Sequence, residues 1–467
     1  MLRMAKGLKV LMVSSEVFPF SKTGGLADVV GSLPSAIHNL GLDIRVATPR
    51  YKSVKVYGNE ARLNNDVPVY FVEHEGYFMR DNLYGTKAGD YPDNLDRFAF
   101  FSKKVLEVLK DLDFKPDIIH CNDWQTALIP VYLKTIFKDD PFYKGTKTIF
   151  TIHNIGYQGL FPKEGFPKTD LPWELFNING LEFYDKVNIL KGGLIFSDII
   201  TTVSPTYSKE IQTKEFGYGL DGVLAQRSDS IFGIVNGIDY EAWNPSKDKA
   251  LKHHFSSANI DGKYKEKKML QRDCGLKEDV NTPLIGIISR LVDQKGIDLI
   301  SQIINPLLKM DVQFILLGTG EEKYHTLFGR IKRKYPGKAS TNLRFDAVLA
   351  KIIYAGSDMF LMPSKYEPCG LGQLISLRYG TIPIVRRSGG LADTIVEYNP
   401  KTGRGTGFVF EKYEANELFG AIKRALHLYK DKSAWRRLVI KAMKCDFSWE
   451  GSAKRYVELY KKLKTQR

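Results

Sequence analysis

The sequence contains few of the residues that build disulfide frameworks or metal sites. Only four cysteines occur among its 467 residues, and no two of them form a CxxC pair. This spacing argues against both disulfides and a cysteine-ligated zinc ion, so we expect reduced thiols. The acidic pair Asp111 and Asp113 lies at a predicted helix end, away from any strand terminus, and we therefore expect no required metal. The cysteines are Cys121, Cys274, Cys369 and Cys445.

Long apolar runs are also missing. No segment approaches the ~20 apolar residues that are needed to cross a bilayer, so we expect no membrane association. The first residues are interrupted by Arg3, Lys6 and Lys9, and they contain no secretory h-region or small-residue cleavage site. These features predict a cytoplasmic location.

The charge balance is strongly basic, with 68 Lys and Arg against 53 Asp and Glu and a net charge of +15. Such a balance raises the question of a nucleic-acid partner. The basic residues are spread along predicted helices and the chain end, as at 263–268 and 461–467, and no nucleic-acid-binding motif organises them. We therefore expect no nucleic acid, but a basic surface that attracts small anions.

Short runs rich in Val and Ile alternate with amphipathic segments along the whole chain. Continuous apolar runs of this length are typical of parallel strands that are buried on both faces. The pattern predicts an α/β protein with two doubly wound parallel-sheet domains. Turn residues at 235–245 mark the boundary, which gives a first domain at 1–238, a second at 239–446 and a terminal helix at 447–467. The clearest strand runs are KVLMVSS, DIRVATP, DIIHCND, KTIFTIHN, DIITTVS, PLIGIISR, VQFILLGTG, DMFLMPS, TIPIVRR and TGFVF.

One glycine-rich turn occurs twice, as SKTGGLADVV at 21–30 and RRSGGLADTIV at 386–396. In the first copy, Gly24 and Gly25 follow a strand and open a helix, whose free N–H groups can bind phosphate. Lys22 stands beside this turn and could add a positive charge. The alternative is a tight strand-to-helix turn with a solvated lysine, and the turn alone does not decide between the two.

Two loops in the second half place charge at the carboxyl ends of predicted strands, where open α/β sheets bind ligands. SRLVDQKG carries Arg290 and Lys295, which could stabilise a diphosphate leaving group in place of a metal. Glu367 in PSKYEPCGL could accept hydrogen bonds from sugar hydroxyls or stabilise an oxocarbenium-like centre. The alternatives are exposed surface charges for the basic pair and a helix-dipole contact for Glu367.

Two first-half loops add groups that suit a carbohydrate site. HCNDW places Asp123 and Trp124 after one predicted strand, and TIHNIGYQG places His153 and Asn154 after another. A carboxylate, an imidazole and nearby aromatic rings are the composition of such a site. Taken singly, Asp123 could instead cap a helix starting near Gln125, and His153 could be a structural histidine.

Together, eight motifs occur in the order and context of one family, over essentially the whole chain. On these motifs the chain resembles the bacterial glycogen synthases and plant starch synthases. The resemblance implies a GT-B fold, with two Rossmann-like domains facing a deep cleft and a last helix that crosses back to the first domain. It also implies retaining transfer of glucose from ADP-glucose to α-1,4-glucan, without a metal or other cofactor. The motifs are KTGGLADV, HCNDW, TIHNIGYQG, VNGID, SRLVDQKG, LGTGE, PSKYEPCGL and RRSGGLADT.

The resemblance also assigns roles on the donor side. Lys22 and Gly25 match the family's phosphate-contacting residues, and Arg290 and Lys295 match the pair that neutralises the diphosphate. Glu367 matches the key carboxylate. The residues expected to contact the transferred glucose from behind Glu367 are Cys369, Gly370 and Leu371.

On the sugar side, Asp123, His153 and Asn236 match residues around the glucose, and Tyr91 matches an aromatic of the acceptor side. Phe345 stands, by spacing, where the family stacks an aromatic ring on the donor base. Because no Asp or Glu is placed as a nucleophile, we expect front-face substitution in which the leaving phosphate takes the acceptor proton. The second GGLAD turn is expected to shape the donor pocket from below.

Two positions depart from related patterns. Ile375 stands where sister families of retaining transferases have a second glutamate, an absence that glycogen synthases share, and Lys351 replaces a frequent histidine. Alternative functions are a related transferase that uses UDP-glucose or another acceptor, and a non-catalytic glucan-binding relative. A nicotinamide dehydrogenase is disfavoured because the first turn lacks G-x-G-x-x-G. The sequence leaves the oligomeric state open.

Overall fold

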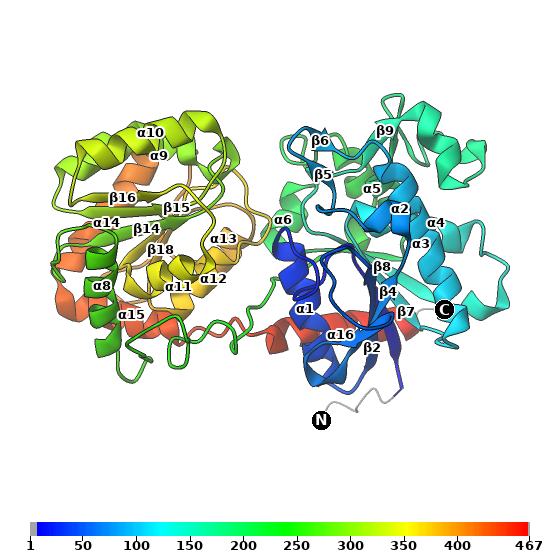
Figure 1. The fold of residues 1–467 in the computed structure, drawn as a ribbon, viewed down its shortest axis with the longest axis horizontal. Helices are drawn as coiled ribbons and strands as arrows, with labels where there is room; N and C mark the ends of the chain where they lie inside the picture. The colour runs from blue at the N-terminus through cyan, green and yellow to red at the C-terminus, as the bar shows by residue number, and fades with distance from the viewer. Residues whose placement is uncertain (1–6, 466–467) are drawn as a thin grey trace. The chain divides into compact units, whose positions relative to one another are not determined.

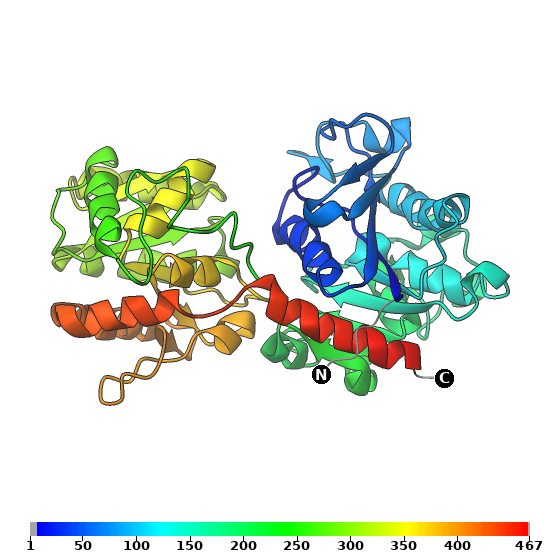
Figure 2. The same cartoon turned by 90° about the horizontal axis from the view of Figure 1, so that it is seen from below.

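The structure, a computed structural model, describes residues 7–465 and divides the chain into two compact units. The N-terminal unit comprises Met1–Gly237 and Trp449–Arg467, and the C-terminal unit comprises Ile238–Ser448. These divisions differ by one residue and by two residues from the domain limits expected from the sequence. Figures 1 and 2 show the two units in two views, with the last helix in the N-terminal unit, as the resemblance implied.

The N-terminal unit is built on an eight-stranded sheet with the order β13-β12-β8-β7-β1-β2-β4-β3. All neighbouring strands are parallel except the edge strand β3, which is antiparallel to β4. The strands are β1 (Lys9–Val13), β2 (Asp43–Pro49), β3 (Glu60–Arg62), β4 (Pro68–Val72), β7 (Ile118–Asn122), β8 (Lys147–Ile152), β12 (Ile199–Thr202) and β13 (Ile231–Gly233).

Helices cover this sheet because its central strands are buried along almost their whole length. The long helix α16 packs against α1. Tyr460 of α16 also joins His120 of β7 by a hydrogen bond of 2.8 Å between the tyrosine oxygen and Nδ1. The helices are α1 (Gly25–His38), α2 (Glu75–Phe78), α3 (Asn94–Asp111), α4 (Leu128–Lys134), α5 (Ile189–Phe196), α6 (Pro205–Glu210), α7 (Asp221–Gln226) and α16 (Trp449–Thr465).

Two small antiparallel elements are inserted in the N-terminal unit and were not predicted from the sequence. The hairpin β5 (Gly85–Thr86) and β6 (Gly89–Asp90) precedes α3. A three-stranded sheet follows β8 in the order β10-β11-β9, together with a 3-10 helix at Lys163–Thr169. Its strands are β9 (Leu160–Pro162), β10 (Glu182–Phe183) and β11 (Lys186–Asn188).

The C-terminal unit contains a six-stranded, fully parallel sheet with the order β16-β15-β14-β17-β18-β19. Its strands are β14 (Leu284–Ile288), β15 (Gln313–Leu317), β16 (Ala339–Asn342), β17 (Met359–Met362), β18 (Ile382–Arg386) and β19 (Phe408–Phe410). Its helices are α8 (Asp261–Asp273), α9 (Ile297–Lys309), α10 (Glu322–Lys334), α11 (Ala347–Gly356), α12 (Gly372–Arg378), α13 (Gly389–Thr394), α14 (Ala415–Lys430) and α15 (Lys432–Met443).

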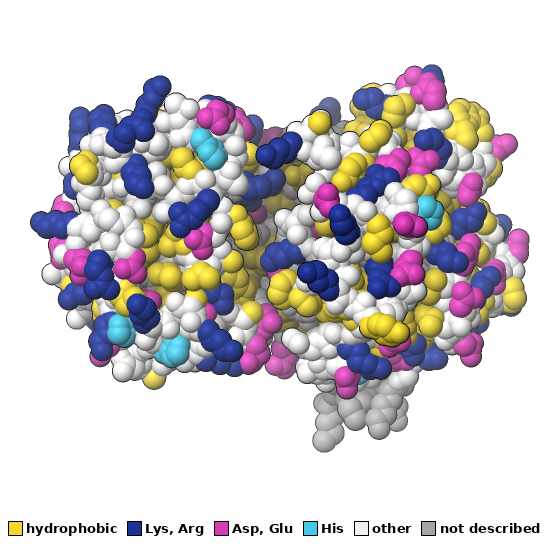
Figure 3. Space-filling view, viewed as in Figure 1, with side chains coloured by type: hydrophobic (Ala, Val, Ile, Leu, Met, Phe, Trp, Pro, Cys, Tyr) yellow, Lys and Arg dark blue, Asp and Glu magenta, His cyan; other side chains and the backbone are white. Residues whose placement is uncertain are grey.

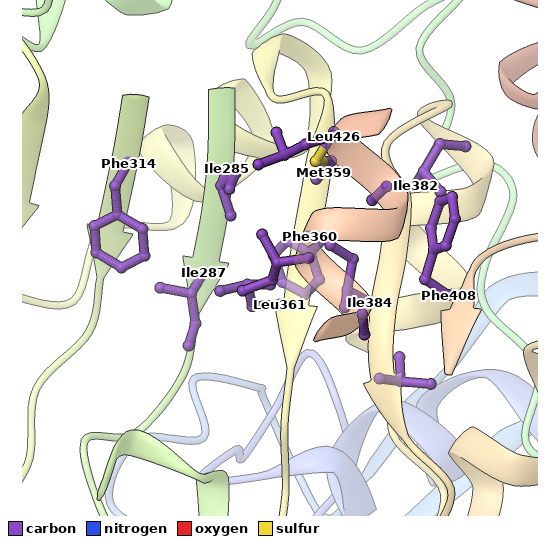
Figure 4. Packing of buried hydrophobic residues seen from close by; sticks show 14 of the residues in the cluster. Ile285, Ile287, Phe314, Met359, Phe360, Leu361, Ile382, Ile384, Phe408 and Leu426 are labelled. Carbon is purple, nitrogen blue, oxygen red and sulfur yellow. The ribbon is translucent and has the colours of Figure 1, made fainter. Parts of the chain in front are cut away.

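The core of the C-terminal unit lies along its central strands, whose β-branched and aromatic side chains are almost completely buried (Figure 4). Ile285 and Ile287 project from β14, Phe360 from β17 and Ile384 from β18. This packing on both faces holds the strands rigidly, so the loops at their carboxyl ends start from fixed positions.

Both sheets reverse their winding direction at one point. In the N-terminal unit the direction reverses between β1 and β7, and in the C-terminal unit it reverses between β14 and β17. Open α/β sheets bind ligands at the carboxyl ends of the strands beside such a switch point. The loops after β1, β14 and β17 contain KTGG, SRLVDQKG and PSKYEPCGL, and HCNDW runs from the end of β7 into the loop after it. The topology therefore places four of the sequence motifs where this fold binds ligands.

Charged side chains of both signs are mixed on the surface. On the face shown in Figure 3, Lys and Arg are scattered over both units among Asp and Glu. Across residues 7–465, no helix combines the length and the apolar character that a bilayer span requires.

Candidate active site

Lys295 and Glu367 form an ion pair at the switch point of the C-terminal sheet. Nζ of Lys295 lies 2.7 Å from Oε2 of Glu367, which also accepts a hydrogen bond of 3.0 Å from the hydroxyl of Ser364. Glu367 is only 6% exposed, whereas the side chain of Lys295 is one-fifth exposed. The structure therefore joins two of the residues predicted from separate motifs, and it adds Ser364.

The backbone after Glu367 is held in a fixed loop. Gly370 has a φ of +73°, which glycine adopts readily, and the side-chain amide of Gln373 donates hydrogen bonds of 2.9 Å to the carbonyls of Cys369 and Gly370. Because this left-handed residue cannot continue a helix, α12 begins at Gly372 with Leu371 as its N-cap. The free N–H groups of the first turn of α12 therefore follow the loop at Cys369 and Gly370.

The second GGLAD turn supports this loop. The N–H of Gly390 donates to the carbonyls of Glu367 and Pro368 at 3.1 Å. A Cβ atom at Gly389 would overlap the carbonyl oxygen of Glu367, and one at Gly390 would overlap that of Cys369. These two glycines allow the backbone of the turn to pack directly against the backbone at Glu367 and Cys369. The turn therefore supports the loop that carries the carboxylate.

Arg290 lies in the loop that leads to Lys295. Its side chain is exposed and forms no ion pair among the described residues. The loop ends at Gly296, which has a φ of +72° and packs against the carbonyl of Pro363. Gln294 accepts a 2.8 Å hydrogen bond from the N–H of Lys365. The loops after β14 and β17 are thus fastened together, with the guanidinium of Arg290 exposed to solvent.

Phe345 is 87% exposed in the connection between β16 and α11. An aromatic ring exposed to this extent is available to stack on a flat ligand. Lys351, at the position that departs from the family pattern, contacts Oδ1 of Asp248 and the carbonyl of Ala242, each at 3.1 Å. Its ammonium group is therefore bound by residues of the C-terminal unit itself.

In the N-terminal unit, the first GGLAD turn opens α1 as expected, and an internal carboxylate binds part of the turn. The N–H groups of Thr23 and Gly24 donate to the carboxylate of Glu16, which is only 3% exposed. A Cβ atom at Gly24 would meet no atom within 4 Å, so the space beside the turn is open. Lys22 forms an ion pair of 2.6 Å with Asp28. Two of the turn's donors thus bind an internal carboxylate, and α1 begins at Gly25.

Glu16 also connects this turn to Tyr91. The hydroxyl of Tyr84 donates to Oε1 of Glu16 at 2.7 Å, and the carbonyl of Tyr84 accepts a 2.9 Å hydrogen bond from the N–H of Tyr91. The guanidinium carbons of Arg80 and Arg97 lie 4.7 and 5.1 Å from the centre of the Tyr91 ring. Cation–π contacts therefore fix the expected acceptor-side aromatic.

His153 is held by the two residues that precede Trp124. The ring nitrogen Nε2 of His153 lies 2.9 Å from Oδ1 of Asn122. The amide nitrogen of Asn122 donates to the carbonyl of Val13 at 3.0 Å, which identifies Oδ1 as the acceptor atom. His153 therefore donates from Nε2, and its Nδ1 carries the lone pair.

Asp123 binds the backbone of the same loop. Its Oδ1 accepts a 2.8 Å hydrogen bond from the N–H of His153, and its own backbone has a φ of +55°. Loss of hydration raises the pKa of the Asp123 carboxyl to about 7, although the hydrogen bonds from the backbone of His153 and Asn154 oppose this shift. Loss of hydration also lowers the pKa of the His153 imidazole to about 3. The ring of His153 is therefore neutral at pH 7.

Asn236 follows β13, and its side-chain oxygen Oδ1 is buried without a hydrogen-bond partner. A buried acceptor of this kind is available to a ligand hydroxyl. Among the described residues, no group of three or more His, Cys, Asp or Glu side chains is placed to hold a metal ion.

The sequence reasoning missed Glu16, Asn122 and Ser364. Glu16 and Ser364 lie in the same post-strand loops as the predicted residues, and Asn122 lies within a quoted motif. The bonds of Glu16 to the N–H of Gly24 and of Ser364 to Glu367 lie within single loops, whereas Asn122 bonds to His153 in the loop after a different strand. The sequence pattern shows these polar residues but not which partners their side chains have.

Two family matches cover most of the chain. Residues 9–226 match the starch synthase catalytic domain, and residues 274–441 match glycosyl transferases group 1. The chain is 49% identical to the glycogen synthase of Thermosipho melanesiensis, over 98% of this chain and 100% of the relative. It is also 49% identical to glycogen synthase 2 of Geobacter sulfurreducens, over 97% and 98%. The chain belongs to the glycogen and starch synthase family.

Solved structures agree with this family. The catalytic domain of starch synthase IV from Arabidopsis thaliana, bound to ADP and acarbose, superposes with a TM-score of 0.88 at 36% identity, over 99% of this chain and all of that chain. Sucrose-phosphate synthase from Thermosynechococcus elongatus shares the fold, with a TM-score of 0.63 at 16% identity over 98% and 99% of the two chains. The predicted family, the GT-B fold class and the glycosyltransferase activity are therefore confirmed.

Proposed function

We propose that this glycogen synthase family member transfers glucose from ADP-glucose to the 4-hydroxyl at the non-reducing end of an α-1,4-glucan, with retention of the α configuration. The paired Lys295 and Glu367 carry this proposal, because they place a cation for the phosphates beside a carboxylate for the sugar. ADP and acarbose are also the molecules bound to the related starch synthase IV.

The donor diphosphate is bound by Arg290 and Lys295. Both follow β14, and their charges stabilise the negative charge that develops as the bond to the glucose breaks. The guanidinium of Arg290 is exposed and forms no ion pair among residues 7–465, so it is free to bind phosphate oxygens. These two cations perform the role of a metal ion, and the reaction needs none.

In the C-terminal unit, the transferred glucose is bound by Glu367 and by the loop at Cys369, Gly370 and Leu371. In the N-terminal unit, His153 and Asn236 are the groups that can bind sugar hydroxyls. Oε2 of Glu367 is bonded to Lys295 and Ser364, which leaves Oε1 for a sugar hydroxyl. A leaving phosphate oxygen takes the proton from the acceptor hydroxyl, so substitution occurs at the front face of the sugar. Groups fixed before the reaction stabilise its transition state without reorganising.

The N-terminal unit contributes the acceptor contacts and further phosphate contacts. Tyr91 offers a ring that is held between two guanidinium groups. Lys22 and Gly25 contribute to phosphate binding beside the open space at Gly24. Asp123 acts by fixing the backbone of His153.

The choice between ADP-glucose and UDP-glucose is the finer part of the proposal. Phe345 can stack on either base, so the structure favours neither. Parallel assays with glycogen, each donor and EDTA would measure nucleotide release and glucan elongation. Release of ADP coupled to elongation supports the proposal, and a preference for UDP-glucose would contradict the assignment of ADP-glucose as the donor. Nucleotide release without elongation would contradict the assignment of α-1,4-glucan as the acceptor. Loss of activity in EDTA would contradict metal independence.

We also propose a cytoplasmic location. Cys121, Cys274, Cys369 and Cys445 are all free thiols, as suits a reducing compartment.

A further inference from the structure

Glu16 lies in the loop after β1, and its carboxylate is almost completely buried. Oε2 accepts hydrogen bonds from the backbone N–H groups of Thr23 and Gly24, and Oε1 accepts hydrogen bonds from the hydroxyls of Thr23 and Tyr84. An ionised carboxylate has about four lone-pair positions. These donors therefore fill the carboxylate, and no acceptor position remains for a ligand.

The first set of bonds fixes the first GGLAD turn. Thr23 and Gly24 stand between Lys22 and Gly25, the two residues proposed to bind phosphate. Glu16 binds Thr23 twice, through the N–H and through the hydroxyl, so the course of the chain is fixed at this point. Because α1 begins at Gly25, directly after the bonded segment, the position of its first free N–H groups depends on the same carboxylate.

The remaining bond reaches the hairpin of β5 and β6 (Figure 1). Tyr84 closes the base of this hairpin, since its carbonyl accepts the N–H of Tyr91 at 2.9 Å. Its hydroxyl lies 2.8 Å from that of Ser15, and because a carboxylate only accepts, Tyr84 donates to Glu16 while Ser15 donates to Tyr84. Burial, Tyr51 and Glu16 raise the pKa of the Tyr84 hydroxyl, so it keeps the proton that it donates.

We propose that Glu16 is a positioning residue for the transfer reaction, which holds the donor-side turn and the acceptor-side hairpin in one fixed arrangement. This role rests on the proposed function, which assigns Lys22 and Gly25 to the donor phosphates and Tyr91 to the glucan. Both substrates then depend on a carboxylate that contacts neither of them. Groups that are fixed in advance lower the entropy cost of bringing two reactants into the correct geometry.

Three substitutions separate the two sets of bonds. Glu16→Gln keeps the shape of the side chain but has one acceptor oxygen, and its amide N–H groups face other donors. It should raise the KM for ADP-glucose and for maltohexaose and lower kcat about 10- to 100-fold, because both groups lose their alignment. Thr23→Val should raise only the KM for ADP-glucose, and Tyr84→Phe only the KM for maltohexaose, each about 3- to 10-fold, the loss of one hydrogen bond.

Asp198→Asn is the matched control. Asp198 accepts hydrogen bonds of 2.7 and 2.9 Å from the N–H and the hydroxyl of Thr148, just as Glu16 binds both groups of Thr23. Asp198 lies at the amino ends of β8 and β12, away from the loops of the proposed site. Asp198→Asn should lower the melting temperature but leave kcat and both KM values unchanged. A loss of stability alone therefore does not produce the pattern expected for Glu16→Gln.

Binding without turnover separates this proposal from the proposed function. Calorimetry with ADP alone and with maltohexaose alone should show that Glu16→Gln weakens the binding of both, even if the wild type transfers no glucose. Wild-type dissociation constants for both ligands in Glu16→Gln would overturn the proposal. Equal effects of Thr23→Val and Tyr84→Phe on both ligands would also overturn it, because the two sets of bonds would then have no separate roles. If Glu16→Gln does not fold, these two variants decide by the same measurements, and unchanged binding in both would overturn the proposal.

Discussion

Nζ of Lys295 and Oε2 of Glu367 lie 2.7 Å apart, although their residues come from loops that follow different strands. The strands β14 and β17 are neighbours at the switch point of the sheet, and this topology brings the two loops together. The cation holds a nearly buried carboxylate in one orientation. The pair therefore orders both the phosphate side and the sugar side of the proposed donor site.

Removing either member of this pair should abolish most of the transfer. Lys295→Ala should lower kcat by about 10²–10³, the cost of one preorganised charge at a developing anion. Glu367→Ala should lower kcat at least as far while the fold remains intact. Initial rates and thermal melting measure both effects. The matched control is Lys323→Ala, because Lys323 forms an exposed pair with Asp293 of the same loop. A Glu367→Ala enzyme with near-normal kcat would contradict the assignment.

The two GGLAD turns should respond differently to alanine at the first glycine of each. Gly389→Ala places a methyl group against the carbonyl of Glu367 at a positive φ, so it should destabilise the protein by about 1–3 kcal/mol and lower kcat. Gly24→Ala enters open space, with a backbone φ of −149° that alanine accepts, and should leave the melting temperature nearly unchanged. Thermal unfolding of the two variants side by side checks this. Equal melting temperatures would refute the supporting role of the second turn.

Asn122 should set the protonation of His153. Asn122→Asp places a carboxylate beside Nε2, which favours the imidazolium and raises the pKa of His153 from its value of about 3. The variant should therefore show a pH dependence of kcat near neutrality that the wild type lacks. Nitrogen NMR of the ring should report the Nε2–H tautomer in the wild type.

Asn122→Leu is the companion variant, since it removes the acceptor without adding charge. Asn122→Leu should lower kcat but should not add a new pH dependence of kcat near neutrality. Identical ring nitrogen shifts in all three proteins would contradict the role of Asn122 as a positioning residue.

Asp123 should make stability fall as the pH rises. Its pKa is about 7 in the folded protein against 3.8 as the ordinary value, so the folded state binds the proton more tightly. The contribution is present in full below pH 4 and is lost between about pH 4 and 7. Asp123→Asn mimics the protonated form and should gain stability relative to the wild type as the pH rises across that window. Denaturant unfolding at pH 5 and pH 8 measures the difference, and a constant difference would contradict the raised pKa.

Phe345→Ala should weaken donor binding without unfolding the protein. The ring is 87% exposed and supports little of the core, so the melting temperature should not change. Loss of a stacked base should raise the KM for the donor about 3- to 10-fold and leave the KM for glucan unchanged. Val348→Ala, also exposed on the adjacent helix, serves as the control. An unchanged KM for the donor would contradict the proposed contact between Phe345 and the nucleotide base.

Much of the architecture could be predicted because it depends on local sequence. Continuous Val- and Ile-rich runs identify buried parallel strands, and the turn residues after β1, β7, β14 and β17 identify the loops at the switch points. The small sheet formed by β9, β10 and β11 escaped prediction, because its strands have only two or three residues and show no alternation.

The contacts within the site were harder to predict, since they join distant residues. The bond between Asn122 and His153 depends on the register of β7 against β8, which pairs Asn122 with Thr151. The two GGLAD turns show the limit most clearly. Their sequences agree over five residues, yet one borders open space and the other packs on the Glu367 loop. Only tertiary structure distinguishes them.

The most direct test of the central claim follows one reaction with two enzymes. Maltohexaose and ADP-glucose are incubated with the wild type and with Glu367→Ala, and ADP release, product mass and the configuration of the new linkage are measured together. The account predicts that the wild type releases one ADP for each glucose added in an α-1,4 linkage. It predicts that Glu367→Ala neither releases ADP nor elongates the glucan. A wild-type enzyme that forms a β linkage, or a variant that elongates at the wild-type rate, would contradict it.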